Sequence, residues 1–302
     1  MKIAYLISVY KDPPHLRRLI KRLLDNNSYF FIHVDLNVDI KPFQNALDEV
    51  KNVIYTNRRF KVSWGGWTQV LYQKELLKTA LSTHLVFDKI FIISGQDYPI
   101  KSNKYIKKEL ENNPQKIYMK AIDYSETIIS KQNQQDYRLY HFFRDSQFNN
   151  FMVKRALIYA SRNLMKLLPI RKKRLPNIYG SHTHIYKSSG YMGLTLDCAK
   201  YVLQELESNK DLIHFFKYSF VPEELVIPTI IFNSKYKQNA EIIKGNYEGL
   251  KKLSGLTYFN YGTKIQVFKD KDYKELKYSD LLFARKFETG VSDGLMDKLD
   301  KE

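Results

Sequence analysis

The sequence is poor in cysteine, glycine and proline. A single cysteine, Cys198, among 302 residues excludes an intramolecular disulfide framework and a zinc site built from several thiolates. Only 12 glycines and 9 prolines, beside 44% hydrophobic residues, exclude collagenous, low-complexity and disordered classes. What remains is an ordinary globular protein of about two domains or one large α/β domain.

Long apolar runs are also missing. No stretch approaches the roughly 18 apolar residues that a membrane-spanning helix needs. Lys11 and Asp12 interrupt the apolar start before a secretory signal could form. We therefore expect a cytoplasmic chain that begins directly in its fold.

Acidic residues are too few to balance the basic ones. The 49 lysines and arginines against 32 aspartates and glutamates give a net charge of +17. Such a balance suits a polyanionic partner, which could be nucleic acid, an anionic membrane surface or a phosphorylated substrate. Charge alone does not choose among the three.

The first half of the chain alternates between strand-like and helix-like apolar patterns. The expected strands are Lys2–Val9, Tyr29–Val34, Val53–Tyr55 and Lys89–Ile93, and the expected helices are His15–Leu24 and Trp67–Leu81. This rhythm predicts a doubly wound α/β fold with a mostly parallel sheet, in which ligands bind beyond the carboxyl ends of the strands.

The second half is less regular. We expect helices at about Asn150–Leu168 and Leu196–Glu207, another that opens at Pro222, and short strands at His184–Tyr186 and Tyr191–Leu194. No repeat or long linker divides the chain. We therefore expect one compact unit with a nucleotide-binding lobe at about 1–125, an acceptor lobe at about 126–288, and a frayed polar tail over 289–302.

Two polar segments follow predicted strands. Asp35 ends the apolar run that starts at Phe31, where a carboxylate could accept hydrogen bonds from a base or a ribose, or could cap a turn. Ser94–Ile100, which contains Asp97, follows the most hydrophobic strand and therefore places polar groups at the edge of the sheet.

Two further segments combine unusual residue types. Trp64, Gly65, Gly66 and Trp67 set two glycines between two aromatic rings, which suits the wall of a sugar site or a packed turn. Glu223 and Glu224 follow Pro222 at a helix start, where they could do acid–base chemistry or compensate the helix dipole.

Metal sites are weakly indicated. The pair His182 and His184 lacks the i, i+4 spacing and the glutamate of a zinc-protease helix. Asp270-Lys271-Asp272 has the letters of a cation-binding Asp-x-Asp, but it stands among lysines and follows no buried strand. We interpret it as a solvated face.

Taken in order, these segments resemble one known family. The segments that match are IAYLIS, FIHVD, VSWGGWTQV, FDKIFIISGQDYPIKS, PEELVIPTI and LLFARKF, which together span about residues 2 to 288. On them, the chain resembles the core-2/I-branching β-1,6-N-acetylglucosaminyltransferases and peptide O-xylosyltransferases, glycosyltransferase family 14. The resemblance implies a GT-A type fold and an inverting transfer from a UDP-sugar without a divalent metal or other cofactor.

The resemblance also implies roles for individual residues. Glu224 takes the position of the catalytic base, and Lys286, beside Arg285, that of a lysine that stabilises the leaving UDP. Asp35 takes the position that contacts the uridine, and we place Trp64, Gly65, Gly66 and Asp97 on the same donor side. A second family cation aligns near Gln266, so that Lys264 is the nearest candidate. For the acceptor we expect Glu223, Arg138, Tyr191 and Tyr261.

One segment stands out for its charge. Eight cations and no acid lie between residues 151 and 174, and they include Arg171, Lys172, Lys173 and Arg174. An apolar stripe at helical spacing runs through the first part: Val153, Leu157, Ala160, Leu164 and Leu168. Such a segment could lie on an anionic bilayer. It could equally be a core-packed helix followed by a solvated basic loop.

The sequence therefore favours a cytoplasmic UDP-sugar transferase, with N-acetylglucosamine or xylose as the donor sugar. It would build a surface polysaccharide at the inner face of the membrane and would not bind nucleic acid. The alternatives are a basic nucleic-acid-binding protein and an inactive membrane-associated scaffold of the same fold.

Overall fold

A computed structural model describes residues 1–125, 137–148, 150–172, 179, 183–245, 247–262 and 264–302. Its central sheet has five strands in the order β3-β2-β1-β4-β8, and only β8 is antiparallel to its neighbour. The strands are β1 (Ile3–Val9), β2 (Ser28–Val34), β3 (Val53–Tyr55), β4 (Lys89–Ser94) and β8 (Met192–Leu194). The predicted α/β fold with a mostly parallel sheet is confirmed.

The central strands are apolar on both faces because both faces are covered. Along β1, Tyr5 and Ile7 point into one hydrophobic core and Ala4 and Leu6 into another, and all are buried. Such continuous apolar runs are typical of parallel strands between two layers of helices. The carboxyl ends of β1, β2 and β4 therefore meet at one edge of a sheet whose two faces are covered by helices.

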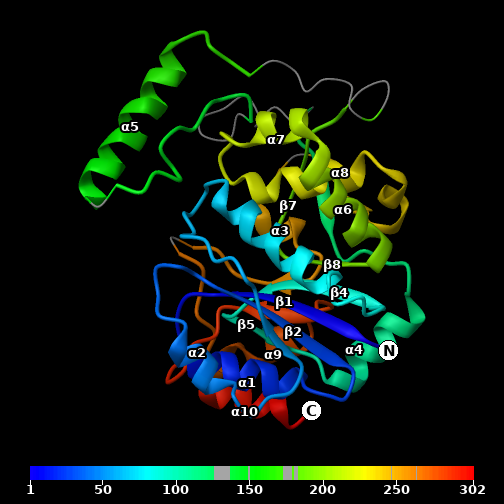
Figure 1. The fold of residues 1–302 in the computed structure, drawn as a ribbon. Coiled ribbons are helices and arrows are strands. Elements are labelled where there is room, and N and C mark those ends of the chain that lie inside the picture. The colour runs from blue at the N-terminus through cyan, green and yellow to red at the C-terminus, as the bar shows by residue number, and fades with distance from the viewer. Residues whose placement is uncertain (126–136, 149, 173–178, 180–182, 246, 263) are drawn as a thin grey trace.

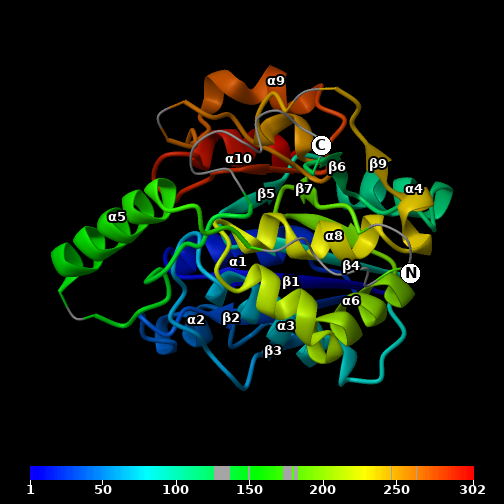
Figure 2. The ribbon, with the colours of Figure 1, turned by 90° about the horizontal axis from the view of Figure 1, so that it is seen from above.

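Helices flank the sheet on both sides (Figures 1 and 2). The first core joins the sheet to α3 (Thr68–Leu81), α6 (Leu196–Ser208), α7 (Lys210–Phe216) and α8 (Val226–Phe232). The second core joins it to α1 (Pro13–Leu23), α2 (Lys41–Ala46), α4 (Asn103–Asn112), α9 (Tyr273–Lys277) and α10 (Asp293–Asp300).

Two small sheets connect distant parts of the chain. One has the order β10-β11-β5 and contains β5 (Asp97–Pro99), β10 (Thr257–Tyr258) and β11 (Phe283–Arg285). The other has the order β7-β6-β9 and contains β6 (Lys120–Asp123), β7 (Tyr186–Ser188) and β9 (Glu241–Ile242). The antiparallel pairing of β11 with β5 brings the end of the chain to the edge where β4 ends.

The predicted helix at 150–168 exists as α5 (Phe151–Leu167), but none of its residues is buried. Figure 1 shows it standing away from the body of the molecule. Of the two alternatives that the sequence left open for this helix, the core-packed one is therefore wrong. Within the described residues, no helix is both long and apolar enough to cross a membrane.

Two local expectations need correction. Pro222 does not open an α-helix: Pro222–Glu224 is one turn of 3₁₀ helix, and α8 starts only after it. The chain after Phe287 is not frayed either, because α10 buries Leu295, Met296 and Leu299 in the second core. Their helical spacing provides an apolar face that a polar composition conceals.

Candidate functional site

Two adjoining cavities lie at the carboxyl edge of the central sheet. The strand-end cavity, of about 400 Å³, lies beyond β1, β2 and β4. Its lining includes Ser8, Tyr10, His33, Asp35, Trp64, Gln69, Tyr191, Glu223, Glu224, Arg285 and Lys286. The outer cavity, of about 660 Å³, is lined by residues such as Tyr124, Lys187, Phe220, Tyr247, Lys251 and Gln266. Four residues line both cavities: Trp64, Glu224, Leu250 and Tyr261.

Asp35 lies where the sequence predicted, immediately after β2. Its carboxylate accepts hydrogen bonds from the N–H groups of Asn37, at 2.8 Å, and Val62, at 3.3 Å. His33, two residues earlier, accepts a hydrogen bond from the Phe60 N–H, and burial lowers its pKa to about 4. The end of β2 therefore presents a fixed carboxylate beside a neutral imidazole.

The cations of the strand-end cavity come from β11 and the residue after it. Arg285 is buried and lies over the ring of Tyr191, 4.3 Å from its centroid, and Lys286 follows it in the lining. Burial, and then the charge of Arg285, lower the pKa of Lys286. Among the described residues, Arg285 has no hydrogen-bond acceptor. Two adjacent cations that lack saturating partners are suited to bind an anion such as a diphosphate.

Asp97 lies behind these cations and does not line either cavity. Its side chain is fully buried, accepts a hydrogen bond from the Ser94 N–H and lies 3.6 Å from Nε of Arg285. Burial raises the pKa of Asp97 to about 6, although the guanidinium opposes that rise. The geometry makes Asp97 a positioning residue for Arg285, whereas the sequence suggested a direct donor contact.

The two glutamates of the 3₁₀ turn have different surroundings. Glu224 forms an ion pair with Lys187 of β7, with 2.6 Å between Oε2 and Nζ, and both side chains are largely buried. Glu223 is buried and accepts a hydrogen bond from Gln69, while its Oε2 has no partner among the described residues. Burial and the nearby Glu224 raise the pKa of Glu223.

Backbone strain directs this pair of side chains. Val221, immediately before the turn, has φ 46° and ψ 57°, a left-handed conformation that β-branched residues rarely adopt. The Val221 N–H donates to the carbonyl of Gly65, which ties the turn to the Trp64 segment. Strain of this kind is common at functional sites. Glu224 thereby lines both cavities, whereas Glu223 faces only the strand-end cavity.

Trp64 forms a wall between the cavities, and the two glycines after it have a packing role. A β-carbon on Gly66 would lie 2.3 Å from the Asp145 carboxylate. That carboxylate accepts hydrogen bonds from the N–H groups of Trp67 and Thr68 and so caps α3. Gly65, at φ +69°, has a left-handed conformation against the Phe220 ring. Neither glycine lines a cavity, and the donor-side role that we expected for them stays a prediction.

The structure thus brings most of the predicted residues together and separates a few. Asp35, Trp64, Tyr191, Glu223, Glu224, Tyr261, Arg285 and Lys286 all line the strand-end cavity. Lys264 and Arg138, expected at the donor and acceptor, line neither cavity. Tyr191 was expected on the acceptor side, but it lies under Arg285.

Sequence reasoning missed Lys187, Gln69 and Asp145. Lys187 lies in a three-residue strand that shows no periodicity, and its partner Glu224 is 37 residues away. Asp145 caps a helix from a loop 77 residues later. Only Gln69 had a local signal, because it lies within the matched segment VSWGGWTQV.

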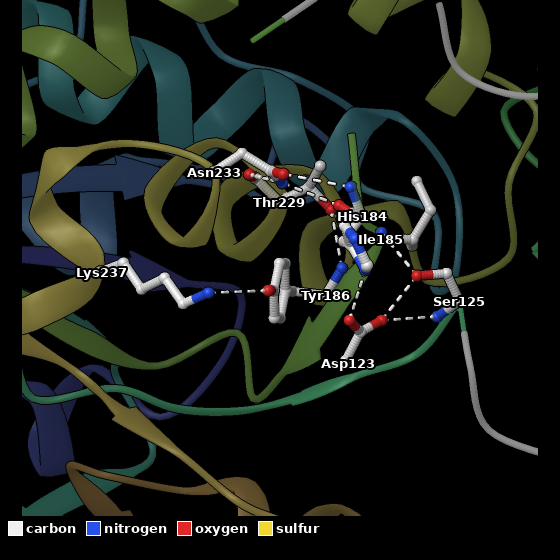
Figure 3. A network of polar contacts seen from close by, with 8 residues as sticks. All are labelled: Asp123, Ser125, His184, Ile185, Tyr186, Thr229, Asn233 and Lys237. Atoms are coloured by element: carbon white, nitrogen blue, oxygen red, sulfur yellow. Dashed lines mark hydrogen bonds and ion pairs between the residues drawn. The ribbon is translucent and has the colours of Figure 1, made fainter. Parts of the chain in front are cut away.

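The candidate metal ligands are used elsewhere. Asp270 pairs with Lys298, and Asp272 accepts a hydrogen bond from the Lys269 N–H. His184 lies 2.6 Å from Asp123, and Figure 3 shows this pair in a network that ties β6 and β7 to α8. His182 lies outside the described residues. Among those described, no group of three or more histidine, cysteine or acidic side chains could hold a metal ion.

Several known proteins are similar to this chain in sequence. The human probable beta-1,3-galactosyl-O-glycosyl-glycoprotein beta-1,6-N-acetylglucosaminyltransferase 7 is 24% identical over 298 residues, which cover 95% of this chain and 64% of that protein. Rat xylosyltransferase 2 is 23% identical, with 99% of this chain and 33% of that protein covered. Xylosyltransferase sqv-6 of Caenorhabditis briggsae is 22% identical, with 78% and 27% covered. The chain thus spans less than two thirds of each of these relatives.

The family model carries the assignment. The model described as Core-2/I-Branching enzyme matches residues 3–245, which hold Asp35, the Trp64 segment and both glutamates. Arg285 and Lys286 follow the matched range. The mixed α/β structure, with a central sheet between helices, is the one expected for a GT-A type protein of this family. The chain belongs to the Core-2/I-Branching enzyme family, glycosyltransferase family 14.

Proposed function

We propose that the protein is an inverting glycosyltransferase that moves N-acetylglucosamine or xylose from a UDP-sugar to a glycan acceptor with β linkage. The observation that carries this proposal is the position of Glu224, which lines both the strand-end cavity and the outer cavity. A general base for glycosyl transfer must reach the acceptor hydroxyl where it meets the anomeric carbon of the donor. Glu224 is the one carboxylate among the described residues that lines both.

The strand-end cavity suits the donor. Its two cations, Arg285 and Lys286, would bind the diphosphate, and Asp35 at the carboxyl end of β2 would bind the nucleoside. The outer cavity, with Tyr124, Tyr247 and other aromatic side chains, suits the sugar rings of an acceptor. The names of the relatives describe N-acetylglucosaminyl and xylosyl transferases and so support the choice of donor sugars.

The transfer then follows from these positions. Oε2 of Glu224 is engaged by Lys187, whereas Oε1 has no hydrogen-bond partner among the described residues. Oε1 would take the proton of the acceptor hydroxyl as its oxygen bonds to the anomeric carbon. The bond from that carbon to the β-phosphate oxygen breaks, and UDP leaves with the electron pair. Arg285 and Lys286 would stabilise the charge that develops on UDP, so that side-chain cations act where other enzymes use a metal ion. Direct displacement converts an α-linked donor into a β-linked product.

The decisive test is Glu224→Gln, which keeps the shape of the side chain and removes the base. We expect a transfer rate lower by about 10² to 10⁴-fold, with UDP binding by thermal shift unchanged. A panel of UDP-sugars identifies the donor in the same assay, and Glu248→Gln in the outer cavity serves as control. Normal turnover in Glu224→Gln together with an inactive Glu223→Gln would move the base by one residue.

Metal independence is a separate part of the proposal. Activity should persist in excess EDTA, because Arg285 and Lys286 would supply the positive charge at the diphosphate. Complete loss of activity in EDTA, restored by Mn²⁺, would contradict this part and leave the base assignment intact.

We also propose that the protein acts in the cytoplasm on a precursor of a surface polysaccharide.

A further inference from the structure

The helix α5 is well formed but largely exposed. Asn150 caps its first turn by accepting hydrogen bonds from the N–H groups of Met152 and Val153. At the other end, Arg171 donates to the carbonyls of Met165, Leu168 and Ile170 and so closes the last turn. Yet no residue of the helix is buried, and Figures 1 and 2 both show it projecting from one side of the molecule.

The outward face of α5 is apolar. Its residues recur at the three- and four-residue spacing of one helical face: Val153, Ala156, Ala160, Leu164 and Leu167. All five are exposed, and Leu167 keeps 84% of its surface accessible. An apolar stripe of this length would be costly to leave in water, so it requires a covering surface.

Another face of α5 is basic and aromatic. Arg155, Arg162 and Lys166 lie together on this face, well around the helix from the stripe, and the segment 150–172 contains no acid. Phe151 and Tyr159 are exposed beside these cations, and the guanidinium of Arg162 lies over the Tyr159 ring. A helix with an apolar face and a basic polar face is typical of helices that lie in a membrane interface.

The basic run that follows α5 contributes less than its sequence suggests. Lys172 is buried, and its ammonium donates to Ser219 and to the carbonyl of Tyr137. Arg171 closes the helix, and Lys173 and Arg174 lie outside the described residues. Lys154 is bonded to Ser63, and Nε of Arg162 is buried. The charges most available to a partner are therefore those of Arg155 and Lys166, which are exposed.

We propose that α5 is an interfacial helix that lies flat on an anionic lipid bilayer, with its apolar stripe in the acyl boundary and its cations at the phosphate groups. The charge complementarity selects this partner, because every charged side chain of α5 is a cation, which matches an anionic surface. The first turn of α5 also contacts the site, since Lys154 donates to Ser63, next to Trp64. If the proposed function holds, docking brings the outer cavity near the membrane, where a lipid-linked acceptor would be found.

Flotation with lipid vesicles tests the proposal. The full chain should float with vesicles of equimolar phosphatidylglycerol and phosphatidylcholine at low salt. With vesicles of pure phosphatidylcholine it should remain at the bottom of the gradient. Arg155→Gln with Lys166→Gln should weaken partitioning by about 30-fold, because each cation near an anionic surface contributes roughly fivefold. This loss should shrink at 0.15 M salt, where the screening length falls to about 8 Å. Leu164→Gln with Leu167→Gln should weaken partitioning at every salt concentration.

Matched controls use the opposite side of the molecule. Lys104→Gln with Lys108→Gln removes the same charge from exposed positions of α4, and Val86→Gln with Tyr278→Gln removes exposed apolar groups elsewhere. These variants should float like the wild type. Wild-type protein that stays unbound at low salt, or controls that lose as much as the α5 variants, would overturn the proposal. The proposal would also be overturned if the wild type formed a dimer that Leu164→Gln dissociates and did not float with any vesicles. Because the assay needs no transfer, its outcome is separate from that of the catalytic test.

Discussion

Replacing Lys187 tests how much this cation stabilises Glu224, the candidate base, in its largely buried position. The side chains of Lys187 and Glu224 are 7% and 15% exposed, and their charged atoms are 2.6 Å apart. At an effective dielectric constant of about 20, unit charges about 3 Å apart attract by roughly 5 kcal/mol. Desolvation offsets part of this attraction. Loss of one partner from such a buried pair typically costs about 3–5 kcal/mol of stability.

We therefore expect Lys187→Met to lower the free energy of unfolding by about 3–5 kcal/mol at neutral pH. Transfer should also slow, because Lys187 no longer holds the Glu224 carboxylate in place. Urea unfolding and kcat/KM at neutral pH measure both effects.

The control is Lys251→Met, which removes an exposed cation from the same outer cavity. Its stability should change by less than about 0.5 kcal/mol, as at most surface positions. Adding Glu224→Gln to Lys187→Met should restore much of the lost stability. If Lys187→Met is as stable as the wild type and transfers sugar at the same rate, Lys187 does not compensate Glu224 and the reasoning fails.

Two further changes test the surroundings of the site. In the wild type, the pKa of Glu223 is raised, so the free energy of unfolding falls as the pH rises from about 4.5 toward that raised pKa. Glu223→Gln should remove this pH dependence and raise the free energy of unfolding by roughly 1–3 kcal/mol at the alkaline end. Parallel urea curves at two pH values measure it, and equal slopes would contradict it. Gly66→Ala should push Asp145 off the first turn of α3 and cost about 0.5–2 kcal/mol, the usual value of a helix cap. Thermal unfolding of Gly66→Ala, Asp145→Ala and the double variant should be non-additive; additive losses would mean that the glycine acts by another route.

Features that follow from local patterns were predictable from the sequence. The apolar run that precedes Asp35 predicted the strand β2. It also predicted the position of the Asp35 carboxylate, because parallel strands end at one edge of the sheet. The helical spacing of α5 was also readable. Its burial was not, because burial depends on what other segments leave uncovered.

Features that depend on distant pairing were not predictable. Nothing near Lys187 indicates that it will meet Glu224, and nothing near Asp97 indicates that its side chain turns inward toward Arg285. The expected roles of Glu224 and Lys286 rested on the resemblance to the family. Leu295, Met296 and Leu299 had a readable helical spacing, which the polar composition of the tail obscured.

The pairing of β5 with β11 has a consequence for the order in which the protein matures. Arg285 and Lys286 reach the strand-end cavity only when β11 has joined β5, which precedes it by almost two hundred residues. While the chain is being synthesised, the strands that carry Asp35 emerge early, but they have no cation to hold a diphosphate. Domains tend to fold as they leave the ribosome. If the proposed function holds, a nascent chain cannot bind the diphosphate of its donor tightly until β11 pairs with β5, so that tight donor binding would report that this small sheet has formed.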